Sequence, residues 1–156
     1  MVREYLGMTT VYNNMSIEEL KSIPLKREKL LRLSSSLNSI DYSSVKGINY
    51  DYDGSHISKH DKIENLTIKI TERKSNLTSS ICELLSELLI LMDNATTIIS
   101  FIPCRKQREL LIKRYIECKP IKAICAELDQ SSHSSFYNLQ IRALEGFINA
   151  QKVHSA

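Results

Sequence analysis

The sequence predicts an all-α fold, and three observations carry that prediction. Its 156 residues include only 4 Gly and 3 Pro, too few for the many turns of a β-rich fold. Apolar residues recur at helical spacing over several stretches, one of which keeps a seven-residue repeat. The composition, 42% hydrophobic and 25% charged, is typical of a soluble globular protein. We expect a long antiparallel, coiled-coil-like helical hairpin over residues 1–102, then a C-terminal helix-turn-helix over residues 103–150 and a short tail, 151–156.

The first helical segment is predicted to end near Leu37. Ser16-Ile17-Glu18-Glu19 has the form of a capping box, in which the serine and the second glutamate cap each other's backbone N–H. The alternative is that it lies inside a longer helix of a segment that begins near Arg3. Apolar residues then recur at steps of three and four, beginning at Leu20 and Ile23. Pro24 lacks a backbone N–H, so it predicts either one kinked helix or two short ones.

A polar loop is predicted at about residues 38–57. The segment is rich in Ser, Asn, Asp and Tyr, holds two of the four glycines, and lacks periodicity. His56 and His60 lie four residues apart near Asp53 and Asp61, a spacing that suits a metal on a helix. No third strong ligand follows at a suitable spacing, so we expect no metal and no other cofactor.

One long helix is predicted from Ser58, which pairs with Asp61 as a cap. Two companion series of residues describe a helix of roughly 40 residues, about 60 Å long. The two series form a mostly apolar stripe along this helix, and the stripe must pack against a partner. The partner is either the first helical segment folded back or a second copy of the chain, and both alternatives stay open. The first series repeats every seven residues: Ile63, Ile70, Leu77, Leu84, Leu91 and Ile98. The second contains Leu66, Arg73, Ser80, Ile81, Leu88 and Ala95.

Three short helical patterns follow Pro103. Leu110 and Tyr115 mark the first, and Pro120 is expected to begin the second, which runs to Leu128. A polar turn, 129–131, leads to Ser132, a good N-cap for the third helix. Two short helices joined by such a turn form a helix-turn-helix. The apolar face of the third helix consists of Phe136, Leu139, Ala143, Leu144 and Phe147.

The net charge of +3 is unevenly distributed along the chain. Residues 103–156 carry a net +4 and residues 1–102 a net −1. Because the excess positive charge lies in the C-terminal third, a polyanion is the natural partner of that third.

The C-terminal third resembles a known family. The pattern Arg-x-Leu-Leu-x-x-Arg-Tyr-x-x-x-Lys-x-Ile-x-x-Ile-Cys-x-x-Leu over Arg108–Leu128, with Ser132-x-x-x-Phe136-Tyr137 and Arg142-Ala143-Leu144, is similar to the promoter-reading fourth region of bacterial sigma factors. With an Arg-Glu-Tyr-Leu start at residues 3–6 and a helical hairpin, the whole layout resembles small phage regulators of Gram-positive bacteria, of the RinA and ArpU type. That resemblance implies a sequence-specific DNA-binding transcription regulator, such as a late-gene activator, of a phage or related mobile element, and implies no catalysis.

In such a helix-turn-helix, the third helix enters the major groove and the start of the second contacts phosphates. Asn138 or Gln140 would suit adenine, and Lys119 and Lys122 would suit phosphate, whereas relatives usually carry Arg or Lys where this chain has His133, Ser134, Asn138 and Gln140. Ile141 is predicted to point outward from the third helix. The predicted DNA-binding residues are Lys119, Lys122, Ser132, His133, Ser134, Ser135, Tyr137, Asn138, Gln140 and Arg142.

Two other functions stay open. The first is a small terminase-type DNA-packaging subunit, and the second is a helical protein-interaction factor that has lost DNA binding. We do not expect an enzyme, because no catalytic constellation or phosphate-binding glycine loop is evident. Expected partners are double-stranded DNA, RNA polymerase or another phage or host protein, and a second copy of the chain. No membrane segment or signal peptide is evident, so we expect the bacterial cytoplasm, with four reduced, buried cysteines.

Overall fold

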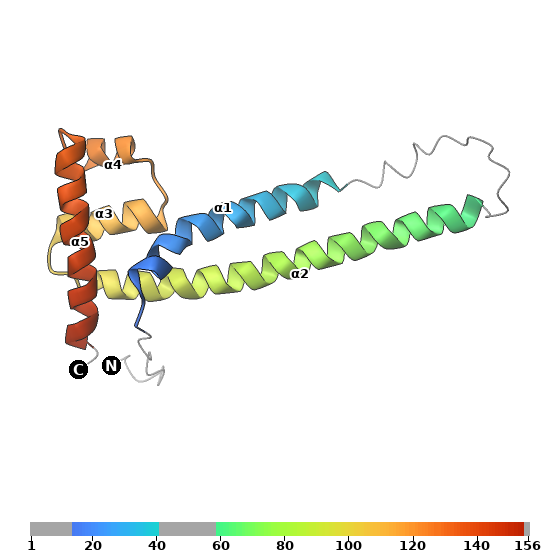
Figure 1. Ribbon diagram of the computed structural model, residues 1–156, viewed down its shortest axis with the longest axis horizontal. Helices are drawn as coiled ribbons and strands as arrows, with labels where there is room; N and C mark the ends of the chain where they lie inside the picture. The colour runs from blue at the N-terminus through green and yellow to red at the C-terminus, as the bar shows by residue number, and fades with distance from the viewer. Residues whose placement is uncertain (1–13, 41–58, 155–156) are drawn as a thin grey trace, which may run out of the picture. The chain divides into compact units, whose positions relative to one another are not determined.

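The computed structural model describes residues 14–40 and 59–154, and all regular structure in these ranges is helical (Figure 1). The elements are α1 (Ile17–Ser39), α2 (Lys59–Ser100), α3 (Arg105–Leu111), the π-helix η2 (Ile112–Ile116), α4 (Ile121–Glu127) and α5 (His133–His154). The prediction of an all-α fold is therefore confirmed. The chain divides into two compact units, Lys26–Leu88 and the combination of Met1–Leu25 with Leu89–Ala156, and α1 and α2 each belong to both.

Helix α1 begins with the predicted capping box. The Ser16 N–H donates to Glu19 Oε2 at 2.7 Å, and the Glu19 N–H donates to Ser16 Oγ at 3.1 Å. The helix continues through Pro24, so the structure has one helix where the pattern allowed two. It ends at Ser39, two residues into the predicted loop, and the remainder of that loop, with its histidine and aspartates, lies outside the described residues. The Arg-Glu-Tyr-Leu start lies outside them too.

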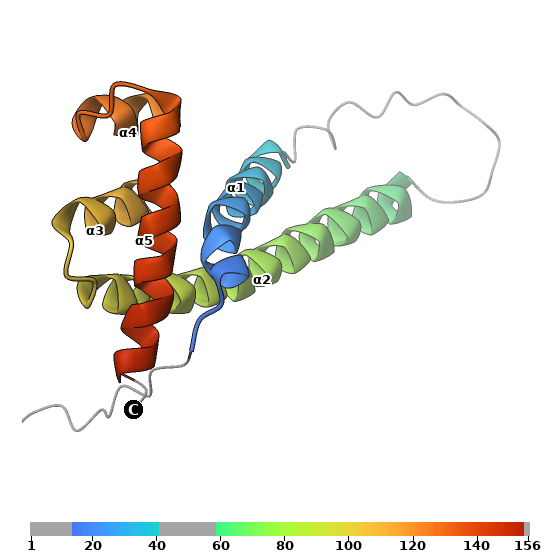
Figure 2. The same ribbon diagram turned by 60° about the vertical axis from the view of Figure 1, so that its left-hand side comes forward.

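Helix α2 has 42 residues and confirms the predicted long helix, although its proposed cap at Ser58 lies outside the described residues. The first series is half-buried or buried throughout, and Arg73 and Ser80 are the exposed members of the second. Within the unit Lys26–Leu88, the α1 and α2 segments run in opposite directions (Figures 1 and 2). An ion pair between Lys26 Nζ and Glu87 Oε1, at 2.5 Å, joins them.

The other unit has its core between α3 and α5. Leu110 and Leu111 of α3 and Phe136 and Phe147 of α5 are fully buried. A Cβ added at Gly146 would lie 2.8 Å from Gln107 Oε1, so α5 passes close to the side chain of that α3 residue. Helices α3 and α4 lie on the same side of α5 (Figure 2). Burying an aromatic or leucine side chain contributes about 1.5–3 kcal/mol, so this contact is a principal source of stability in the unit.

The connection from α3 to α4 differs from the predicted plain helix and turn. The helix widens into η2, where the Glu117 N–H donates to Ile112 O at 2.8 Å, and Cys118 then adopts a left-handed conformation (φ 57°). Pro120 is the residue before α4 rather than its first residue. Its extended backbone, φ −66° and ψ 149°, explains the shift. Asp129, two residues after the end of α4, is a second left-handed residue (φ 54°).

The prediction of buried cysteines is wrong. Cys82 and Cys104 are exposed, Cys118 and Cys125 are half-buried, and all four are free thiols. Cys104 immediately precedes α3, and Cys82 lies outside the two buried series of α2. The prediction rested on the apolar residues that surround the cysteines in the sequence. The positions of the cysteines relative to those residues place the thiols outside the core.

Cys118→Gly should stabilise the protein by about 1 kcal/mol, because glycine adopts the left-handed conformation without the steric cost of a Cβ. Cys125→Gly is the matched control, since Cys125 is equally half-buried but lies inside α4, where glycine should destabilise by about 1 kcal/mol or more. Urea unfolding of both variants measures the difference. A Cys118→Gly variant no more stable than the parent would contradict the argument.

Candidate nucleic-acid interface

The turn between α4 and α5 is held by side chains from both of its ends. Gln130 Nε2 donates to Leu128 O at 3.2 Å, and Gln130 Oε1 accepts a hydrogen bond from the Ser135 hydroxyl. The Ser135 N–H donates to Ser132 Oγ at 3.2 Å, which confirms Ser132 as the predicted N-cap of α5. These bonds close the turn on itself and fix where α5 begins.

The buried side of α5 determines which side faces outward. Phe136, Ala143 and Phe147 have no exposed surface, and the Tyr137 ring packs edge-on against Phe136 with 5.6 Å between centroids. The opposite side carries four exposed residues at relative positions 0, 3, 4 and 7, a spacing that puts them on one helical face. We call this set the outer face of α5: Ser134, Tyr137, Asn138 and Ile141.

Two of the predicted DNA-binding residues instead have internal partners: Ser135, predicted to face outward, and Gln140, predicted at the flank of that face. Ser135 is half-buried against Gln130, and Gln140 Nε2 donates to the Tyr115 hydroxyl at 2.9 Å. The spacing could have shown the second case, because Gln140 lies one turn after Phe136 and so on the buried side of α5. Ser132, His133, Ser134, Tyr137, Asn138 and Arg142 are exposed, in keeping with their predicted accessibility.

The two predicted phosphate contacts lie in different environments. Lys122 is exposed and has no ion-pair or hydrogen-bond partner among the described residues. Lys119 Nζ lies 2.9 Å from Glu127 Oε1 and 3.2 Å from Glu117 Oε2. Lys113 also pairs with Glu127, so one carboxylate binds two lysines.

These contacts shift the ionisation of the residues involved. Hydrogen bonds from Lys113 and then Lys119 hold the pKa of Glu127 below its ordinary value, while those to Glu127 and then Glu117 raise the pKa of Lys119. Glu127 and Lys119 therefore both stay charged near neutral pH, and the Lys119 charge is balanced by carboxylates of the protein. The sequence did not predict the role of Glu127, because Lys119 precedes α4 and so lies outside the helical spacing that contains Glu127.

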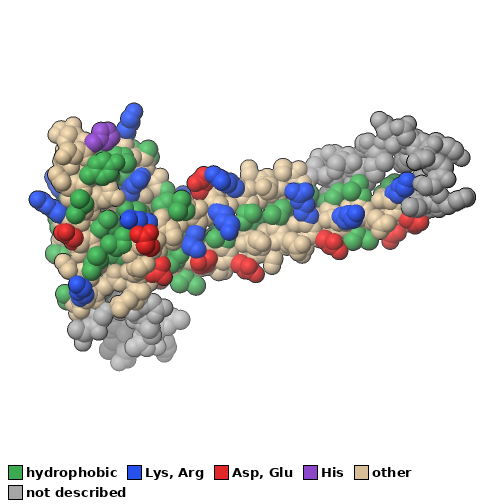
Figure 3. All heavy atoms as spheres, viewed as in Figure 1, with side chains coloured by type: hydrophobic (Ala, Val, Ile, Leu, Met, Phe, Trp, Pro, Cys, Tyr) green, Lys and Arg blue, Asp and Glu red, His purple; other side chains and the backbone are tan. Residues whose placement is uncertain are grey.

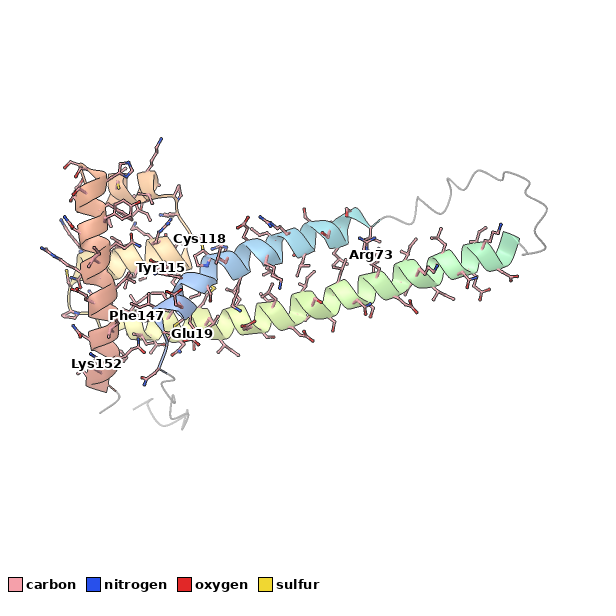
Figure 4. The ribbon with its side chains drawn as sticks, in the orientation of Figure 1. Glu19, Arg73, Tyr115, Cys118, Phe147 and Lys152 are labelled. Atoms are coloured by element: carbon pink, nitrogen blue, oxygen red, sulfur yellow. The ribbon has the colours of Figure 1, made fainter. Side chains whose placement is uncertain are left out.

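A groove of about 370 Å³ lies beside Tyr115, and Figure 4 shows its lining residues Tyr115 and Cys118. Lys21, Leu25, Arg114 and Gln140 also line it. The Cys118 thiol lies 3.6 Å from the backbone oxygen of Tyr115 rather than beside a general base. In the described part of the chain, no group of three or more His, Cys, Asp and Glu side chains is placed to hold a metal ion.

Comparison of the chain with protein-family models, with curated proteins and with solved structures gave no match. Within residues 14–40 and 59–154, none of the helices combines the length and the apolar character needed to cross a membrane.

Glu127→Gln should remove a stabilising contribution that depends on pH. Because the pKa of Glu127 is lowered in the folded state, the contribution is present above its ordinary value of 4.5 and is lost as the pH falls through the lowered value. Urea midpoints measured from about pH 7 to pH 3 should show the parent more stable than the variant only at the higher pH. Glu145→Gln, at an exposed site on α5, is the control, and parallel profiles for parent and Glu127→Gln would contradict the assignment.

Proposed function

We propose that this chain is a DNA-binding transcription regulator of a phage or related mobile element, and that α4, the turn and α5 act as a helix-turn-helix. The observation that carries the proposal is the outer face of α5, which is exposed and follows a turn fixed by its own side chains. A helix so positioned fits the major groove, which is about 12 Å wide. The sigma-like sequence pattern over Arg108–Leu144 supports the same function.

The charge around α5 is compatible with DNA. No Asp or Glu occurs from Gln130 to Leu144, while Arg142 and Lys122 are exposed. Figure 3 shows histidine, hydrophobic and basic side chains where α5 begins. A carboxylate within the first three turns would repel phosphates, and its absence there favours a polyanionic partner.

The antiparallel α1 and α2 segments are proposed to form the helical hairpin of residues 1–102, with the DNA-binding part in residues 103–150. Leu31, Ile68 and Leu85 are large apolar residues that stay exposed in the unit Lys26–Leu88. The hairpin is proposed to contact a second copy of the chain or RNA polymerase. Activation of late genes in the bacterial cytoplasm is the role that the family resemblance favours.

Lys122→Ala should weaken binding to all DNA sequences, because Lys122 is free to bind phosphate. It should also reduce the slope of log K, the association constant, against log salt concentration by about one. Lys119→Ala should have a smaller effect, since two carboxylates already bind that ammonium. Fluorescence anisotropy with a random duplex over a salt series measures both slopes.

The control is Lys69→Ala, which removes an exposed lysine from α2. It should leave the slope unchanged. Equal slopes for the parent protein and Lys122→Ala would exclude Lys122 as a phosphate contact, and a parent protein that binds no duplex at low salt would contradict the proposed function.

Asn138→Ala should cost about 1–3 kcal/mol on the preferred site and little on random DNA, because an Asn amide binds both N6 and N7 of adenine. Asn149→Ala is a matched control, since Asn149 is exposed on α5 three turns further along. Competition binding with the preferred and random duplexes compares the two variants. Full retention of specificity by Asn138→Ala would contradict base reading by this residue.

A further inference from the structure

The outer face of α5 leaves two large apolar side chains uncovered next to an amide. Tyr137 is 51% exposed and Ile141 is 57% exposed, and they lie one helical turn apart. Asn138 is exposed beside them. Apolar residues scattered singly over a surface are ordinary, but two on consecutive turns of one face form a continuous apolar strip.

The strip is held in a fixed position. Tyr137 packs edge-on against the buried Phe136, with an interplanar angle of 78°. Ile141 is β-branched, so its χ1 is restricted in a helix. A binding partner would therefore meet apolar groups that are already ordered, and it would lose little conformational entropy on contact.

The chemistry of this face matches A·T base pairs. In the major groove an A·T pair offers the thymine C5-methyl group to apolar side chains and the adenine N6/N7 edge to an amide, whereas guanine is usually read by Arg or Lys. The outer face of α5 has no Arg or Lys, and Arg142 lies about 100° further round the helix than Ile141. The lack of carboxylates from Gln130 to Leu144 favours DNA over a basic protein surface as the occupant.

We infer that the outer face of α5 reads A·T pairs, with Tyr137 and Ile141 contacting thymine methyl groups and Asn138 contacting an adjacent adenine. This inference rests on the proposed function and specifies its DNA sequence class. The four residues span two helical turns, about 10 Å, which corresponds to about three base pairs. The operator should therefore contain a short A·T run at the point where α5 enters the groove.

The test uses the full chain and replaces single thymines by deoxyuridine, a change that removes only the C5-methyl group. Preferred duplexes are first selected from a random pool, and the dissociation constant is then measured for each replacement. One or two replacements should weaken binding by about three- to fivefold, the value expected for losing one buried methyl group. Ile141→Ala should weaken binding to the thymine duplex by a similar factor and should no longer respond to one of those replacements.

Tyr137→Ala provides a second variant. Its affinity should no longer fall when the neighbouring thymine is replaced by deoxyuridine. Ile68→Ala, which truncates an exposed isoleucine on α2, should bind like the parent protein and keep its sensitivity to methyl removal. If the parent binds DNA but no deoxyuridine replacement matters, or if both α5 variants keep the full response, the inference is wrong and the proposed function stands. If no duplex binds at low salt, both are wrong.

Discussion

The burial of one side of α5 is the constraint on which the rest of the unit that contains α3, η2, α4 and α5 depends. Phe136, Ala143 and Phe147 lose all contact with solvent, and because successive residues turn by about 100°, their burial fixes the direction of every other side chain on the helix. A rotation of α5 by one residue would bury Tyr137 and expose Phe136. The exposed set Ser134, Tyr137, Asn138 and Ile141 is thus a consequence of core packing.

Polar side chains around this core mostly position the backbone. Gln130 joins Leu128 to Ser135 across the turn, and Gln140 joins α5 to Tyr115 of η2. Glu127 holds Lys113 and Lys119 together across the chain between η2 and α4. Because Ser135 and Gln140 are used in this way, the accessible polar groups in the first three turns of α5 lie on its outer face, at His133 and at Arg142.

Local patterns predicted much of the fold. The seven-residue repeat identified α2, and the Ser16 and Ser132 caps were found because their partners lie three residues away. Features that depend on a partner more than four residues away along the chain were not predicted. Ser135, Gln140 and Glu127 each act through a partner beyond the reach of a helical spacing, and the exposure of Cys104 depends on where α3 starts.

The π-helix η2 has a consequence for deletions in this part of the chain. Its turn is closed by the hydrogen bond from the Glu117 N–H to Ile112 O, five residues earlier, so it is wider than a turn of α-helix. Deleting one residue between Leu111 and Tyr115 would rotate Tyr115 by about 100° about the helix axis. Its hydroxyl would then leave Gln140 Nε2, and η2 would lose its hydrogen bond to α5.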